Sequence, residues 1–172
     1  MIISYDKQQT IKPVSLNNQA IYEQIAKETE MLELSALLGI AFYQKIDNNK
    51  EHYSEILNAT EYVNSQGYTI THQGLYYVIA YLVFAKYIAN SYVNDTFSGF
   101  VKKNLQNSEH LNEGERRRLQ HEYRSIALTA FETIKEYLIL KNTDYPLWGC
   151  KVGTTGSLPK FYTVTNKQYY DS

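Results

Sequence analysis

Residues able to perform metal, acid–base or nucleophilic chemistry are few in this sequence and are poorly spaced for it. The four histidines include no pair three or four residues apart, the spacing that places two metal ligands on one helix face. These histidines are His52, His72, His110 and His121. Cys150 is the only cysteine, which excludes an internal disulfide and a cysteine-rich zinc site. We therefore expect no metal site and no bound cofactor.

Motifs for nucleophilic or phosphate chemistry are not found either. Ser98 and Ser157 lie outside any nucleophile-elbow pattern, and residues 153–156 lack the lysine of a phosphate-binding loop. Five glutamates have the spacing of a solvated helix face, which is the default interpretation of such a pattern. They are Glu113, Glu115, Glu122, Glu132 and Glu136. We expect no catalytic residue and no enzymatic activity.

Arg116, Arg117 and Arg118 form the one basic cluster. They fall in the first turns of a predicted helix, where the helix dipole disfavours cations. Successive residues on a helix point about 100° apart, so at most two of the three can meet one surface. Salt bridges to Glu113 and Glu122 on a solvated face would explain the cluster. Contact with a phosphate or a partner protein is the alternative.

The last residues combine aromatic side chains with turn formers. Beyond Asn142 the glycines and prolines exclude a long helix, and residues 161–165 are β-favouring and alternate in polarity. Such a segment can add a strand to the sheet edge of another protein. We predict that residues 146–172 form an extended docking tail, with plain C-terminal disorder as the alternative. The predicted partner-binding residues are Trp148, Leu158, Phe161, Tyr162 and Val164.

Residues 73–92 predict the helix around which the rest of the chain packs. No residue from 74 to 85 is charged, and a helix that is apolar on every side needs neighbours on every side. A membrane span is the alternative, but a bilayer requires about 20 mainly apolar residues. Lys86 and many tyrosines interrupt this run, so a central core helix is favoured. Residues 93–103 then predict a structured loop with a short strand.

Two helices are predicted before this central helix, after an extended arm. Residues 1–16 show weak alternation and contain Pro13, which indicates an extended arm with little to bury. Residues 17–29 and 30–46 have apolar side chains at helical spacing. Gly39 is expected to be tolerated inside the second of these helices.

A hairpin and a long last helix complete the pattern. Residues 61–70 predict a β hairpin in which Gly67 takes a positive φ angle. Residues 112–140 predict the last helix, opened by a capping box between Asn112 and Glu115. The fold class expected is mainly α, a helical bundle of about four principal helices with a small β hairpin and extended N- and C-terminal arms. The helical domain is expected to span residues 17–145.

Length and charge limit the functions that the chain can have. Its 172 residues fit one domain, since domains commonly have about 100–150 residues. A formal net charge of −1 disfavours sequence-independent binding of nucleic acid. Residues 1–15 have no apolar core of the kind found in secretory signals. We expect a cytoplasmic product that does not enter a membrane.

Three segments and their order carry a family resemblance. They are L-S-A-L-L-G-I-A-F-Y at residues 34–43, G-L-Y-Y-V-I-A-Y-L-V-F-A-K-Y-I from Gly74, and D-T-F-S-G-F-V-K-K from Asp95. Together with the long last helix and the tail, this order resembles the head–tail connector adaptor proteins of tailed phages, in particular those of crAss-like and other phages of Bacteroidetes. The similarity spans residues 17–145.

The resemblance implies a structural virion protein made in the host cytoplasm and located at the head–tail junction. It implies a dodecameric ring of identical subunits that binds the portal protein above and further tail or connector proteins below. Genomic DNA would pass through the ring without sequence-specific binding. The tail would dock on the portal or on a neighbouring subunit. The alternatives are a small helical regulatory or nucleic-acid-binding protein, and an enzyme with a pocket between helices.

Overall fold

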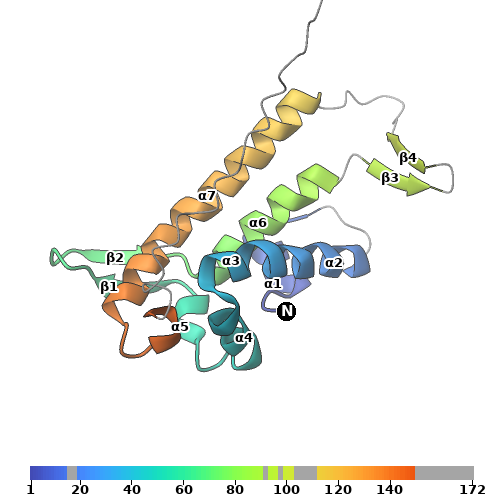
Figure 1. Ribbon diagram of the computed structural model, residues 1–172. Helices are drawn as coiled ribbons and strands as arrows, with labels where there is room; N and C mark the ends of the chain where they lie inside the picture. Colours follow the sequence, from blue (N-terminus) through green and yellow to red (C-terminus); the bar gives the residue numbers. More distant parts are fainter. Residues whose placement is uncertain (15–18, 91–92, 97–98, 103–111, 150–172) are drawn as a thin grey trace, which may run out of the picture.

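The computed structural model describes residues 1–14, 19–90, 93–96, 99–102 and 112–149 (Figure 1). Within these residues the fold is mainly α with small β hairpins, which confirms the predicted class. The helices are α1 (Tyr5–Ile11), α2 (Gln19–Thr29), the π-helical turn η1 (Glu30–Leu34), α3 (Ser35–Leu38), α4 (Ile40–Asn48), α5 (Ser54–Leu57), α6 (Leu75–Asn90), α7 (Glu113–Leu140) and α8 (Pro146–Gly149). The strands are β1 (Thr60–Val63), β2 (Thr69–His72), β3 (Val93–Thr96) and β4 (Gly99–Lys102).

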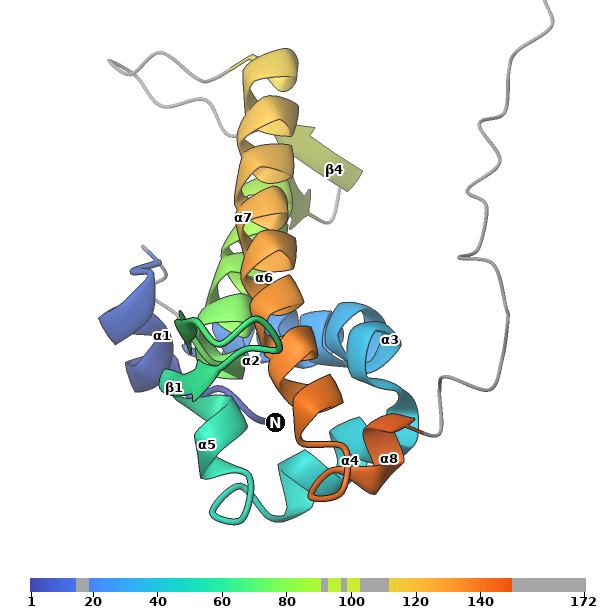
Figure 2. The same ribbon diagram turned by 90° about the vertical axis from the view of Figure 1, so that its left-hand side faces the viewer.

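Helix α6 lies at the centre of the fold, as the sequence predicted. It packs along α7, and α2, α1 and α5 pack against its other sides (Figures 1 and 2). Val78, Ile79 and Val83 are fully buried, which explains why polar residues are missing from these positions. None of the helices in the part of the chain that the structure describes is both long and apolar enough to span a membrane.

Gly74 precedes α6 at a point where two backbones nearly touch. Its φ angle is 79°, and a Cβ atom there would lie 2.4 Å from the carbonyl carbon of Asn58. Only glycine fits such a close approach in this conformation. Gly74 thereby ends the β1–β2 hairpin and starts α6 directly against the end of α5.

Helix α7 begins at the predicted capping box. The Asn112 side chain accepts a hydrogen bond from the Glu115 backbone N–H at 2.9 Å, and the Glu115 carboxylate accepts one from the Asn112 backbone N–H at 2.9 Å. Its buried side chains all lie in the second half of the helix. The first turns of the helix therefore extend beyond the core (Figure 2).

Two antiparallel hairpins flank the helices. In the first, β1 pairs with β2 so that Tyr62 faces Ile70, and Gly67 has the predicted positive φ of 85°. In the second, β3 pairs with β4. The sequence predicted a loop with one short strand there, and the structure has two strands.

The single helix predicted over residues 30–46 is wrong. The helical path runs from α2 through η1 and α3 and stops at Gly39, whose φ and ψ angles are 85° and 141°. These angles lie outside any helical region, so α4 begins in a new direction at Ile40. Glycine at this position makes a corner and is not a tolerated helical residue.

The predicted extended arm over residues 1–16 is also wrong for the residues that are described. Residues 5–11 form α1, with Ser4 capping its first turn. Ile2 and Ile3 are buried, and so is Val14. This segment belongs to the core through these buried side chains, and a side chain from another element also binds its first residues through their backbone.

Glu30 is that side chain, and it is fully buried at the start of η1. Its Oε1 atom accepts hydrogen bonds from the backbone N–H groups of Ile2 and Ile3, both at 2.9 Å. Its Oε2 atom accepts a hydrogen bond from the Tyr43 hydroxyl at 3.2 Å. Burial raises the pKa of Glu30, while the two backbone N–H groups oppose that shift. Glu30 thus links the first residues of the chain to η1 and α4.

Lys12 fixes the other end of this N-terminal segment. Its Nζ atom lies 4.7 Å from the ring centroid of Phe84 on α6 and 4.5 Å from that of Tyr123 on α7. Cation–π contacts of this kind are favourable within about 6 Å. The N-terminal segment is therefore held across both central helices.

Candidate partner-binding surfaces

Trp148 was predicted to be an anchor of the docking tail, and the structure corrects this. The chain turns after α7, where Tyr145 N–H donates to the Lys141 carbonyl at 3.1 Å, and α8 folds back onto the core. The Trp148 ring centroid lies 6.3 Å from that of Phe42 and 6.0 Å from that of Phe131, and Trp148 is 8% exposed. Its ring is used inside the subunit, so the helical domain extends at least to residue 149. The other predicted tail residues lie outside the described residues: Leu158, Phe161, Tyr162 and Val164.

Trp148 belongs to an aromatic cluster at the end of the molecule where α7 stops. The rings come from α4, α7, α8, the β1–β2 hairpin and the residues before α5 and α8. They are Phe42, Tyr53, Tyr62, His72, Phe131, Tyr137, Tyr145 and Trp148. Edge and tilted ring contacts dominate, which is the arrangement that aromatic pairs prefer.

The tyrosine hydroxyls of this cluster bond to carboxylates at its margin. The Tyr137 hydroxyl donates to Glu55 Oε2 at 2.7 Å, and the Tyr62 hydroxyl lies 2.9 Å from Glu136 Oε2. Burial and the bond to Glu136 raise the pKa of Tyr62 to about 12. Both hydroxyls therefore stay protonated at neutral pH and act as donors.

His72 is the buried histidine of the cluster. Its Nδ1 atom accepts a hydrogen bond from the Gly74 backbone N–H at 3.2 Å, and its ring centroid lies 4.9 Å from that of Tyr137. Burial lowers the pKa of His72, with Glu55 opposing the shift. We interpret His72 as a neutral packing residue.

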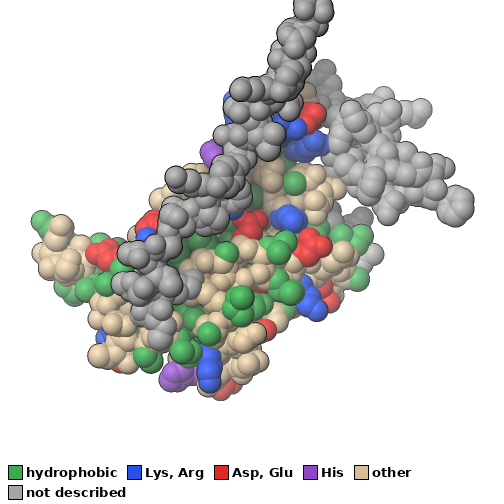
Figure 3. All heavy atoms as spheres, viewed as in Figure 1, with side chains coloured by type: hydrophobic (Ala, Val, Ile, Leu, Met, Phe, Trp, Pro, Cys, Tyr) green, Lys and Arg blue, Asp and Glu red, His purple; other side chains and the backbone are tan. Residues whose placement is uncertain are grey.

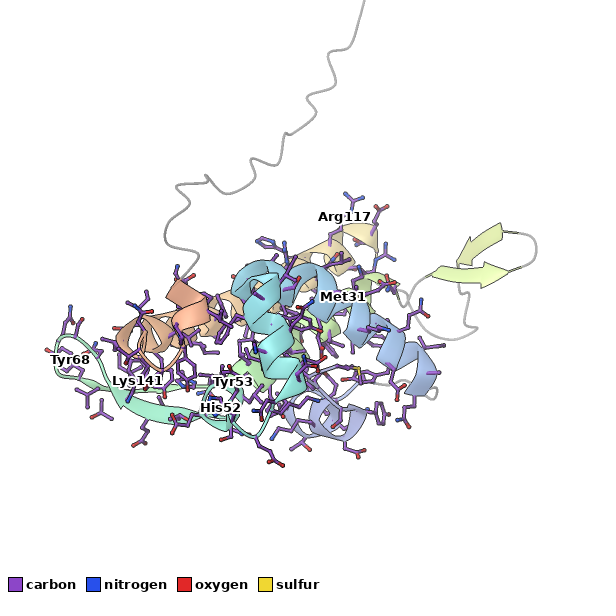
Figure 4. The ribbon with its side chains drawn as sticks, turned by 60° about the horizontal axis from the view of Figure 1, so that its bottom comes forward. Met31, His52, Tyr53, Tyr68, Arg117 and Lys141 are labelled. Carbon is purple, nitrogen blue, oxygen red and sulfur yellow. The ribbon has the colours of Figure 1, made fainter. Side chains whose placement is uncertain are left out.

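One groove beside the cluster is bounded by α4, by the residues before α5 and by Leu147 of α8. It has a volume of about 560 Å³ and is named here the α4–α8 groove. His52 and Tyr53 lie next to each other at this end of the molecule in Figure 4, with ring centroids 4.8 Å apart. The lining residues are Ala41, Gln44, Lys45, Asn48, Asn49, His52, Tyr53 and Leu147.

A second groove, named here the β1–α7 groove, lies between strand β1 and the last turn of α7. Its volume is about 480 Å³. Val63 and Leu140 are exposed at this groove, at 61% and 43%. The lining residues are Glu55, Thr60, Glu61, Tyr62, Val63, Tyr137, Leu140 and Lys141. The sequence did not predict this groove, because its walls come from segments about 80 residues apart, such as Glu55 and Tyr137, which are 82 residues apart.

A third surface is apolar and follows η1 and the start of α4. Met31, Leu32 and Ile40 are 57%, 64% and 68% exposed, and they are named here the apolar segment. Figure 3 shows hydrophobic side chains gathered over the part of the molecule where α3 and α4 lie. The apolar periodicity of residues 30–46 predicted a core position for Met31, which is wrong, and it made no prediction for Leu32 or Ile40.

The arginine cluster lies at the opposite end of α7 from the aromatic cluster (Figures 1 and 4). Arg117 is exposed and forms an ion pair with Glu113, as the interpretation of a solvated face predicted. Arg118 is also exposed, whereas Arg116 is partly buried. The structure does not bring these arginines together with the aromatic residues. A different pair that the sequence gave no reason to expect joins α7 to η1, with Arg124 Nε 2.8 Å from Glu33 Oε2.

No group of three or more potential metal ligands occurs among the residues that the structure describes. The geometry is thus that of a small, mainly α protein whose notable surface features are open grooves and an exposed apolar segment. Residues 34–156 match the model of a family described as a family of unknown function, DUF6712. Because this match covers well over half of the chain, the protein belongs to that family. No curated protein and no solved structure matches the chain.

Proposed function

We propose that the protein is a structural head–tail connector adaptor of a tailed phage, forming a ring beneath the portal and linking the capsid to the tail. The resemblance over residues 17–145 and the helical fold support this proposal. The partners are the portal protein, identical subunits in a dodecameric ring, and further tail or connector proteins. The location is the virion, at the head–tail junction.

The observation that carries the proposal is the apolar segment. Met31, Leu32 and Ile40 are all more than half exposed, whereas Leu34 and Phe42 on the same stretch of the chain are buried. Exposed large apolar side chains close to one another along the chain are candidates for protein–protein contact. We propose that this segment is covered in the assembly.

A closed ring also needs two different surfaces on each subunit. Cyclic symmetry with more than two copies places one surface patch against a different patch of the next copy. The apolar segment and the β1–α7 groove are two chemically different surfaces, one apolar and one of mixed polarity. This combination is compatible with a heterologous contact.

DNA passage through the ring does not require a basic protein. The formal net charge is −1, and a lumen that binds phosphates tightly would slow the genome. We expect weak, salt-sensitive affinity for duplex DNA. Nanomolar binding of short duplexes at physiological salt would favour a regulatory or nucleic-acid-binding protein in its place.

The test is assembly with the portal protein of the same genome. We expect co-expression to yield a complex whose mass, measured by native mass spectrometry, corresponds to a ring of subunits on the portal. Ile40→Glu should reduce this complex strongly, because it places a charge in an apolar contact. Ile21→Glu is the matched control, since Ile21 is an exposed isoleucine on α2. A wild-type protein that never binds the portal would refute the proposal.

A further inference from the structure

Strand β1 has an edge with no strand beside it in the described chain. The sheet consists of β1 and β2 alone. Asn64 N–H donates to the Tyr68 carbonyl at 2.9 Å, so the backbone of Asn64 faces the hairpin partner. Backbone groups alternate in direction along a strand, so Tyr62 also faces β2 and the N–H and C=O groups of Glu61 and Val63 point away. Both residues line the β1–α7 groove.

The groove beside this edge offers contacts to side chains as well as to a backbone. Tyr62 and Tyr137 form an aromatic wall, and Val63 and Leu140 supply exposed apolar surface. Glu55 and Glu61 are acidic, with Lys141 as the only basic residue of the lining. An extended peptide that is apolar on one face and flanked by lysines would complement this surface.

The sequence of this chain contains such a peptide beyond the described residues. Residues 161–165 include no glycine or proline, so each of them can pair through its backbone. Tyr162 and Val164 share one face of a strand because side chains alternate with a period of two. Lys160 and Lys167 flank the segment and match the acidic lining of the groove.

We propose that residues 161–165 of a second copy of this chain add to β1 as a third strand, with Tyr162 and Val164 in the β1–α7 groove. The inference rests on the proposed ring, in which each subunit meets a neighbour. In Figure 2, α8 and β1 lie on opposite sides of the lower end of α7, so a chain leaving α8 starts away from its own groove. This arrangement favours the groove of another subunit.

Disulfide cross-linking tests this pairing with the full-length chain. In a Cys150→Ser background, Val63→Cys is placed in one chain and Thr163→Cys in a second chain that carries a size tag. The two side chains would lie on the same outer face of the extended sheet, within disulfide reach. We expect a covalent heterodimer when the two are mixed and oxidised. Thr69→Cys, opposite Val63 on β2, is the matched control and should give little of this product.

A backbone variant separates strand pairing from mere proximity. Glu61→Pro removes an N–H group that points away from β2, so the bonds between β1 and β2 are kept. It should abolish the heterodimer, whereas Thr71→Pro, at the opposite position on β2, should leave it. If Glu61→Pro is unfolded by circular dichroism, Thr165→Pro in the chain that carries Thr163→Cys serves instead, with Thr155→Pro as its control.

The outcomes separate this inference from the proposed function. Rings on the portal without the cross-link would overturn the inference and leave the proposed function standing. A cross-link that forms only within one chain carrying both cysteines would overturn it as well. If no covalent heterodimer forms under any oxidising condition, the strand-addition inference is wrong, whether or not rings are seen.

Discussion

The first residues of the chain and the last described ones are both bound into the core, but by different kinds of contact. Ile2 and Ile3 are held through backbone N–H groups that donate to the buried Glu30 side chain. Trp148 is held through ring contacts with Phe42 and Phe131. In addition to its buried side chains, the first end thus depends on buried polar groups, whereas the other end depends on aromatic packing.

This difference predicts which kind of substitution weakens each end most. Ring contacts stabilise the fold in proportion to the apolar area that they remove from water, and they tolerate small shifts in position. A buried carboxyl that binds backbone N–H groups gains little net energy, but leaving those groups unpaired is costly. The aromatic end should therefore be destabilised most by removing side-chain volume. The polar end should be destabilised most by removing a hydrogen-bond acceptor.

Trp148→Ala should have the largest effect. Removing a large buried ring costs about 3–5 kcal/mol in the free energy of unfolding. Urea denaturation followed by circular dichroism measures this loss. Leu147→Ala is the neighbouring control, because Leu147 is only half-buried and should lose much less. Equal losses for the two variants would show that Trp148 is not a core residue.

Glu30→Ala should follow, with a loss of about 2–4 kcal/mol. Two buried N–H groups lose their acceptor, and each unpaired group costs about 1–3 kcal/mol. The same denaturation experiment applies. Glu30→Gln keeps one acceptor oxygen and should lose about half as much. A larger loss for Glu30→Ala than for Trp148→Ala would reverse the ranking of the two ends.

The two ends should also respond oppositely to pH. The pKa of Glu30 is raised above its usual 4.5, so its contribution to stability is complete below that pH and is lost as the pH rises through the folded value. The pKa of His72 is lowered below 6.5, so its contribution is complete above that pH and is lost as the pH falls through the folded value. Free energies of unfolding measured from pH 4 to pH 8 would show both slopes.

Two variants test which residue causes each pH dependence of the free energy of unfolding. Glu30→Gln should flatten the loss on the rising side, and His72→Asn, which keeps an acceptor for Gly74 N–H, should flatten the loss on the falling side. If His72→Asn left the acid slope unchanged, the buried histidine would not be its cause.

Arg117→Ala should have the smallest effect. Its ion pair with Glu113 is exposed, and such pairs contribute about 0–1 kcal/mol, less at high salt. We expect a change within about 0.5 kcal/mol and unchanged binding of duplex DNA in a salt titration. A marked loss of DNA affinity would revive the phosphate-contact hypothesis for the arginine cluster.

Patterns confined to one segment allowed α6, α7 and the first hairpin to be predicted. The residues that determine each of these elements are close together in the sequence. They are the uncharged run of α6, the Asn112–Glu115 capping box of α7 and the turn at Gly67. Residues 1–14 could not be predicted, because the acceptor for their backbone lies 28 residues away in Glu30. Trp148 was visible as an aromatic residue, but nothing in the sequence shows that Phe42 would face it.

The surfaces were harder to predict than the core. The ion pair of Arg117 follows from helical spacing, and it was predicted. The corner at Gly39 requires a positive φ that a helical pattern does not reveal, so the change of direction at the start of α4 was not expected. The predicted contacts of Leu158, Phe161, Tyr162 and Val164 remain predictions.

The position of Lys12 between Phe84 and Tyr123 has a consequence in time. The Lys12 amino group lies 3.4 Å from the Tyr123 hydroxyl, and the two residues are 111 positions apart. A ribosome that adds about 5–20 residues per second makes Tyr123 roughly 5–20 s after Lys12. The segment that is synthesised first is therefore among the last to be secured. During that interval Glu30 is available to hold Ile2 and Ile3, but Lys12 lacks its contact with Tyr123.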